Sequence, residues 1–140
     1  MLKRLQNRKY VDQIALTPRA AANLEPLPEG LLVGPASEIL GLHWSQGGLL
    51  IVVGAIGAVT RLIAPLLKTK DKDPAVIVLD ARGINVVPLL GGHKAGAENL
   101  AIQLADELGG NVVITADSNT KGLLAIDSFG TFLERSTKTM

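Results

Sequence analysis

Two short, wholly apolar runs, LLIVV at 49–53 and AVIVL at 75–79, limit the folds open to this chain more than any other feature. A strand that is apolar at every position is typical of a parallel sheet whose two faces are both covered by helices. Helices are predicted at about 58–67 and 97–108, and the second carries an apolar stripe at helical spacing. The sequence therefore predicts an α/β fold: a single three-layer domain with a mostly parallel sheet flanked by helices.

Weaker patterns supply the other elements. They predict a strand at 12–17, a helix opening at Pro18, a strand at 31–33, at most one helical turn at 37–40, a loop at 41–48, a hairpin strand at 84–88 and a strand at 111–115. Residues 1–11 are predicted to be a basic lead-in, 12–130 the α/β domain and 131–140 a polar tail. The sequence thus predicts one domain with short flanking segments.

Composition excludes several classes of function. The chain has 140 residues, a formal net charge of +1 and no cysteine, which argues against nucleic acid as a partner, a disulfide scaffold or a thiolate metal site. The apolar stretch 49–67 contains Arg61 and Pro65, and a central arginine is costly in a bilayer. We expect a protein without a membrane span, compatible with the reducing cytoplasm.

Ligands in parallel α/β sheets bind beyond the carboxyl ends of the strands, and three turns are expected there: 54–57, 80–83 and 91–96. In the last turn, Gly91 and Gly92 allow a ligand to approach the backbone, and the following helix start offers N–H groups to an anion. His93 could act as a general base or acid near neutral pH. A tight loop with His93 capping the helix is the equally open alternative.

Other polar residues have a simpler interpretation beside a functional one. Arg61 either extends outward from an apolar helix stripe, which spacing favours, or points at an acidic ligand. The segment KTKDKD at 68–73 is most simply a solvated loop. Ile56 and Val59 replace two glycines of the dinucleotide fingerprint, so nucleotide binding is the weakest hypothesis. His43 has no ligand companion at a metal-site spacing, and no metal site is predicted.

Several motifs, taken in order, resemble the N-terminal domain of the cobalamin-biosynthesis protein CbiG. They are RLIAPLLKTK at 61–70, DPAVIVLD at 73–80 and LLGGHKAGAENLA at 89–101, and they match R-x-I-A-P-L-L-x-x-K, D-P-A-V-V-V-x-D and L-x-x-G-H-x-G-G-A-x-x-L-A of that family. The opening segment IALTPRAAANL is also similar to that of the family. The resemblance covers about half of the chain.

The resemblance implies a role in building the corrin ring. Family members act on cobalt-precorrin-5A, a tetrapyrrole rich in carboxylates, by opening the δ-lactone on ring A hydrolytically and releasing acetaldehyde, with no redox cofactor. His93 is then the candidate base that activates water, and Asp80 could orient it or polarise the water. The candidate substrate-binding residues are Arg61, Lys68, Gly54, Gly57, Gly91, Gly92 and Gly96.

Full-length family members continue into further domains. The segment IDSFG at 126–130 also resembles the point where some fused proteins pass into a precorrin-3B C17-methyltransferase. Two functions therefore stay open. The chain is either a cobalt-precorrin-5A hydrolase, or a module of one, or it is a non-catalytic corrinoid-binding module that works with such a methyltransferase or with a separate C-terminal partner.

Overall fold

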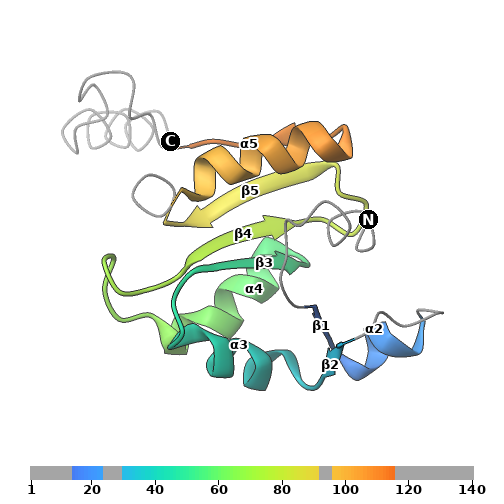
Figure 1. Ribbon diagram of the computed structural model, residues 1–140, viewed down its shortest axis with the longest axis vertical. Helices are drawn as coiled ribbons and strands as arrows, with labels where there is room; N and C mark the ends of the chain where they lie inside the picture. Colours follow the sequence, from blue (N-terminus) through green and yellow to red (C-terminus); the bar gives the residue numbers. More distant parts are fainter. Residues whose placement is uncertain (1–13, 24–29, 92–95, 116–140) are drawn as a thin grey trace, which may run out of the picture.

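A four-stranded sheet with helices on both faces forms the centre of the computed structural model, which describes residues 14–23, 30–91 and 96–115 (Figure 1). The strands are β1 (Ala15–Leu16), β2 (Leu32–Val33), β3 (Leu49–Val53), β4 (Ala75–Leu79), β5 (Asn85–Leu90) and β6 (Asn111–Val112). The helices are α2 (Pro18–Ala22), α3 (Ala36–Trp44), α4 (Ile56–Ile63), the 3₁₀ turn η1 (Ala64–Leu66) and α5 (Ala97–Leu108).

The main sheet has the order β3-β4-β5-β6, and a separate pair joins β1 to β2. The pairs β3–β4 and β5–β6 are parallel, as is β1–β2, whereas β4 and β5 form an antiparallel hairpin. The mostly parallel α/β architecture and the hairpin predicted after residue 80 are both confirmed.

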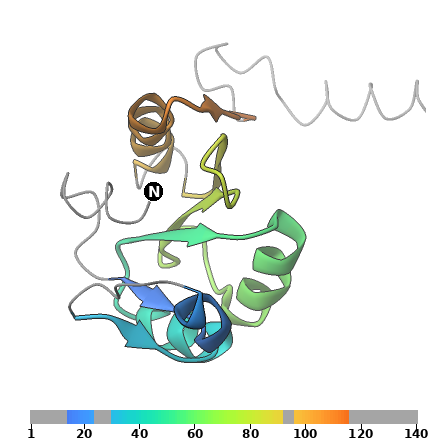
Figure 2. The same ribbon diagram turned by 90° about the vertical axis from the view of Figure 1, so that its right-hand side faces the viewer.

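Alternate side chains of β4 fill two cores, one on each face of the sheet. Ile77 and Leu79 pack with the buried stripe of α5, which includes Leu104, while Val76 and Val78 pack with α3 and α4. Figure 2 shows α5 on one side of the sheet and α3 with α4 on the other. Because β4 is central, all of its residues are buried, as the apolar run predicts.

The other apolar run, 49–53, was expected to be buried on both faces, and this expectation is wrong. β3 lies at the edge of the four-stranded sheet. Its first four residues are only half-buried, and Val53 is 41% exposed. An apolar run fixes the strand but not its place in the sheet, because the order of the strands depends on long-range pairing.

The region 36–48 also differs from its prediction. Instead of one turn followed by a loop, α3 is helical as far as Trp44. Leu40 and Trp44 are one helical turn apart and both are buried against α4 and β4. This i, i+4 pair stabilises the helix through tertiary packing, which outweighs the low helix propensity of Gly41.

The remaining elements match their predictions in part. Helix 58–67 begins two residues earlier and ends as a 3₁₀ turn, and strand 111–115 pairs only at Asn111–Val112. In the described ranges, no helix is long and apolar enough to cross a membrane. The stretch 49–67 instead folds as β3, α4 and η1.

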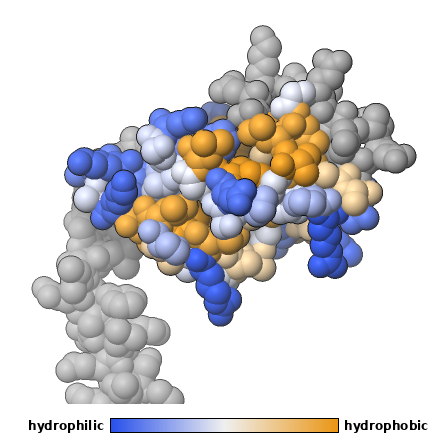
Figure 3. All heavy atoms as spheres, turned by 90° about the horizontal axis from the view of Figure 1, so that it is seen from below, coloured by the Kyte–Doolittle hydropathy of each residue, from blue (hydrophilic) through white to orange (hydrophobic). Residues whose placement is uncertain are grey.

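The face that carries α3 and β2, seen from below in Figure 3, exposes apolar patches between hydrophilic side chains. Leu42 is 61% exposed and Val33 is 52% exposed. None of the site residues predicted from the sequence belongs to these two elements, so the candidate site has to be sought at the ends of the main sheet.

Candidate functional site

The antiparallel hairpin divides the predicted site residues between two ends of the sheet. Gly54 and Asp80 follow the parallel strands β3 and β4 and lie at one end, which we call the Asp80 edge. Gly91 follows β5, whose last residue, Leu90, pairs with Val76 at the start of β4. Gly91 therefore lies at the opposite end, the Gly91 edge, and the expectation that all three turns begin at the same edge of the sheet is wrong.

At the Asp80 edge, the carboxylate of Asp80 organises the hairpin turn. Its Oδ1 accepts hydrogen bonds from the N–H groups of Arg82 (3.1 Å) and Ile84 (2.9 Å). Its Oδ2 accepts bonds from the backbone N–H and the side-chain amide of Asn85, both at 2.9 Å. The hydrogen bond from the backbone N–H of Ile84 lowers the pKa of Asp80 most; desolvation opposes this shift, and the N–H donors of Asn85 and Arg82 add to it, so that the pKa is lowered overall. The role expected for Asp80 beside His93 stays a prediction, because His93 lies outside the described residues.

We expect the lowered pKa of Asp80 to make stability depend on pH in the acid range. The folded protein favours the ionised carboxylate, so this stabilisation is present above the pKa of the unfolded chain and is lost as the pH falls through the lower folded-state pKa. Asp80→Asn should therefore flatten the acid limb of a curve of unfolding free energy against pH. A control variant, Asp106→Asn on exposed α5 surface, should keep that limb; an unchanged limb in Asp80→Asn would contradict the assignment.

The guanidinium of Arg61 also lies near the Asp80 edge. Arg61 lies in the last turn of α4 and is exposed, and its Nη1 is 3.6 Å from the position that a Cβ on Gly57 would take. The guanidinium thus folds back toward the start of the helix, the usual direction of helical side chains. No side chain caps α4, because its N-cap residue is Ala55. Gly54 donates its N–H to the carbonyl of Leu79 and joins the two strand ends (2.9 Å).

At the Gly91 edge, a cavity of about 230 Å³ brings together two of the predicted residues, Lys68 and Gly91. The residues that line it come from the segment after η1 and from the end of β5: Leu67, Lys68, Thr69, Lys70, Asp73, Pro74, Leu90 and Gly91. The N–H of Ala97 donates to the carbonyl of Gly91 (3.4 Å), which places Gly96 at the same end. Gly92 and His93 lie outside the described residues, in the segment that joins Gly91 to Gly96.

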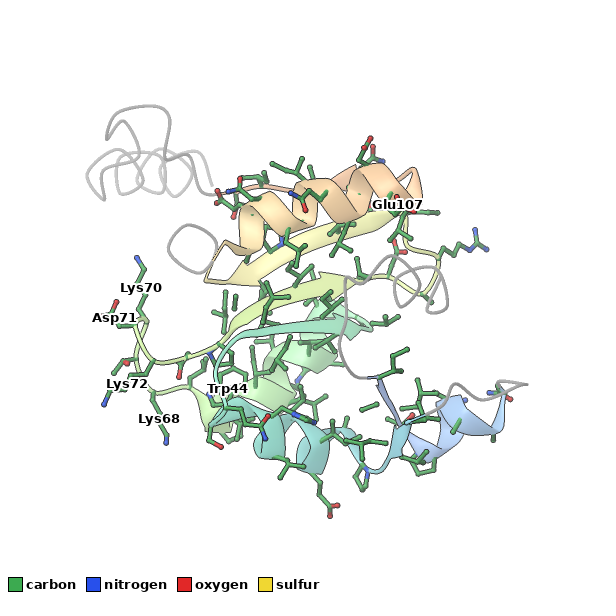
Figure 4. All side chains as sticks on the ribbon, in the orientation of Figure 1. Trp44, Lys68, Lys70, Asp71, Lys72 and Glu107 are labelled. Carbon is green, nitrogen blue, oxygen red and sulfur yellow. The ribbon has the colours of Figure 1, made fainter. Side chains whose placement is uncertain are left out.

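The lysine loop, residues 68–73, has a defined internal structure. Both carboxylate oxygens of Asp73 accept the N–H of Lys68, at 3.1 and 3.0 Å. The N–H groups of Lys72 and Asp73 donate to the carbonyl of Thr69 (3.2 and 2.9 Å). Figure 4 shows Lys68, Lys70 and Lys72 projecting from this end of the molecule. The interpretation as a plain solvated loop is therefore incomplete, because Lys68 and Lys70 border a cavity.

Sequence reasoning missed Lys70, Leu67 and Leu90 as cavity residues. A signal for Lys70 was present, because the family pattern R-x-I-A-P-L-L-x-x-K ends on this lysine and not on Lys68. The apolar lining gave no signal, since its residues are distant in sequence and meet only through the hairpin. Within the described part of the chain, no cluster of side chains has the composition of a metal site.

Comparison with known proteins places these features in a family. The family model described as Cobalamin synthesis G N-terminal matches residues 38–119, which include most of α3, the lysine loop and both edges of the sheet. A curated cobalt-precorrin-5A hydrolase of Priestia megaterium is 44% identical over 89 residues, 64% of this chain and 24% of the relative. A cobalt-precorrin-5A hydrolase of Salmonella typhimurium is 44% identical over 79 residues, which are 56% of this chain and 22% of the relative.

A solved structure supports the fold. It is described as a cobalamin biosynthesis protein G homologue from Sulfolobus solfataricus, with a TM-score of 0.54 and 25% identity over 78% of this chain and 38% of that one. The chain thus spans about a quarter of the length of the curated relatives it matches. On the family match over more than half of its residues, the chain belongs to the Cobalamin synthesis G N-terminal family.

Proposed function

We propose that this chain serves in the hydrolysis of cobalt-precorrin-5A and binds this tetrapyrrole at the Gly91 edge. The reaction is that of its curated relatives, by name cobalt-precorrin-5A hydrolases. In it, water adds to the lactone carbonyl and the C–O bond of the lactone ring breaks, which leaves a carboxylic acid and an alcohol. The C–C bond between the alcohol carbon and the macrocycle then breaks: the two-carbon fragment leaves as acetaldehyde, and the macrocycle keeps the electron pair and takes up the proton that the hydroxyl loses. The observation that carries the proposal is that Lys68 and Gly91 line one cavity, and Gly91 precedes His93 by two residues in the sequence.

The cavity suits one carboxylate-bearing arm of the substrate better than the whole macrocycle. Its volume, about 230 Å³, is below the roughly 300–1,000 Å³ of pockets that enclose drug-sized ligands. The ammonium groups of Lys68 and Lys70 favour a carboxylate at the rim. Leu67 is 47% exposed there and offers apolar contact to a methylene chain or to the edge of the macrocycle.

The Asp80 edge is a second place where a substrate carboxylate could bind. There the uncapped start of α4 offers backbone N–H groups beside the Arg61 guanidinium, a combination that favours anions. A strand of five residues separates this edge from the Gly91 edge, a distance of about 17 Å at roughly 3.3 Å per residue. Arg61, with Gly54 and Gly57, is therefore proposed to contact a different part of the substrate from the part that Lys68 contacts.

Lys68→Gln should weaken the binding of cobalt-precorrin-5A by on the order of 10- to 100-fold, because it removes one charge-assisted hydrogen bond, worth roughly 1.5–3 kcal/mol. The matched control is Lys72→Gln, which makes the same change of charge in the same loop at a residue that does not line the cavity. Titration of the purified chain with the substrate measures both affinities. Equal affinities of the two variants would show that binding depends on the general charge of the loop, and not on the cavity.

A second candidate function is a non-catalytic corrinoid-binding module that works with a methyltransferase or a separate C-terminal partner. The hydrogen bonds of Asp80 favour it, because its carboxylate already accepts N–H groups of the hairpin turn and is not free to act on water. An acetaldehyde assay on the chain mixed with cobalt-precorrin-5A separates the two functions, because a binding module binds the substrate without releasing acetaldehyde.

As part of the same proposal we place the protein in the cytoplasm, in keeping with a cysteine-free chain. Cell fractionation tests this location.

A further inference from the structure

Asp73 joins the lysine loop to the core of the domain. Besides accepting the N–H of Lys68 with both carboxylate oxygens, its Oδ1 accepts a hydrogen bond from the indole Nε1–H of Trp44 on α3, at 3.3 Å. Both donors precede this acidic residue in the sequence, Trp44 by 29 residues and Lys68 by five. One carboxylate thus connects α3 with the first residue of the loop.

Trp44 is fixed by its surroundings. It is 6% exposed and packs in the core cluster with Leu40, Val59 and Ile63. A buried tryptophan in close packing has little rotational freedom, so its indole N–H points to a fixed place. Figure 4 shows Trp44 beneath the sheet, near the end where the lysine loop begins.

The bonds of Asp73 close the loop around the cavity. The carboxylate holds the N–H of Lys68 at the start, and the carbonyl of Thr69 accepts the N–H of Asp73 at the end (2.9 Å). Lys68, Lys70 and Asp73 all line the same cavity. Asp73 therefore holds the backbone of Lys68 directly, and it fixes the backbone of Lys70 by closing the loop that contains this lysine.

We propose that Asp73, held by Trp44, is a positioning residue that keeps Lys68 and Lys70 at the mouth of the cavity to receive a substrate carboxylate. The inference rests on the proposed function, since it concerns the same site. Asp73 does not itself bind the anion, because its negative charge repels a carboxylate and its oxygens already accept N–H groups.

A role through charge and a role through positioning predict opposite changes in anion affinity when Asp73 is replaced. If Asp73 acted through charge alone, Asp73→Asn would strengthen the binding of an anion by removing a nearby negative charge. If Asp73 positions the loop, the same variant weakens binding, because the asparagine amide keeps only one acceptor oxygen and an NH₂ group meets a backbone N–H. Trp44→Phe keeps an aromatic ring in the core and removes the N–H donor.

The probe is uroporphyrin III, a stable tetrapyrrole with acetate and propionate arms, titrated into the full chain at low salt and followed by its absorbance. We expect Asp73→Asn and Trp44→Phe each to weaken binding about fivefold, and the double variant to lose little more, because the two residues act as one unit. Ile77→Val, a change in the core cluster on the other face of the sheet, which does not contain Trp44, is the control for loss of stability and should keep wild-type affinity. Thermal unfolding of each variant verifies that the protein is folded.

Two results would overturn the inference in different ways. If Lys68→Gln weakens uroporphyrin binding but Asp73→Asn leaves it unchanged or strengthens it, the positioning role is wrong and the proposed binding site stands. If Lys68→Gln also leaves binding unchanged, the proposed site is wrong and the positioning role is lost with it.

Discussion

Replacing His93 by alanine should lower the rate of acetaldehyde release from cobalt-precorrin-5A by on the order of 10²–10⁴-fold, the usual contribution of a general base. Two properties of His93 support this expectation, its proton affinity and its position in the chain. Imidazole can take a proton from water near neutral pH, and His93 lies two residues after Gly91, which lines the cavity proposed to hold the substrate. Substrate affinity should change much less than the rate, since Lys68 and Lys70 are retained.

His43 provides the matched control, because it is the only other histidine in the chain. It lies on α3, with its Nδ1 3.3 Å from Oε1 of Gln46, and does not line the cavity. Single-turnover assays of acetaldehyde with wild type, His93→Ala and His43→Ala separate chemistry from binding. Wild-type rates in His93→Ala would show that another group activates the water.

Replacing Gly110 by alanine should destabilise the domain by about 3 kcal/mol, at the upper end of the usual cost of overpacking. A Cβ at this position would be 2.5 Å from the carbonyl oxygen of Ile84 and 2.6 Å from that of Gly83. Both atoms belong to the backbone of the hairpin turn that Asp80 organises, so they cannot move aside as a flexible side chain would. Hydrogen bonds hold the contact from both sides, from Gly110 N–H to Ala105 (2.8 Å) and from Asn111 N–H to Ile84 (2.6 Å).

Urea unfolding curves measure this loss, and Gly41→Ala is the control. Gly41 lies within α3 and a Cβ there would meet nothing within 4 Å, so alanine should stabilise the protein by about 0.5–1 kcal/mol through helix propensity. The two Gly→Ala variants should thus differ in sign. If Gly110→Ala were as stable as wild type, the end of α5 would not be packed tightly against the hairpin.

Local patterns predicted most of the secondary structure correctly because they depend on neighbouring residues. The stripe of α5 has its small and apolar residues on one face, and Gly109 ends the helix with a left-handed backbone (φ 68°), as the Gly109-Gly110 pair indicates. The predictions for α3 and for β3 are wrong for the same physical reason: both depend on contacts with segments that are distant in the sequence. Trp44 and Leu40 stabilise their helix only when α4 and β4 are in place.

The sequence by itself determined the α/β class, the two apolar strands, the hairpin after Asp80 and, through its motifs, the family. The tertiary structure alone decided which candidate residues share a site. An antiparallel β5 carries its carboxyl end to the opposite end of the sheet from Asp80, so Gly91 meets Lys68 and Lys70 there, while Arg61 stays with Gly57. Strand direction and loop closure depend on hydrogen bonds between segments far apart in the chain, such as that from Trp44 to Asp73, and spacing along the sequence does not record them.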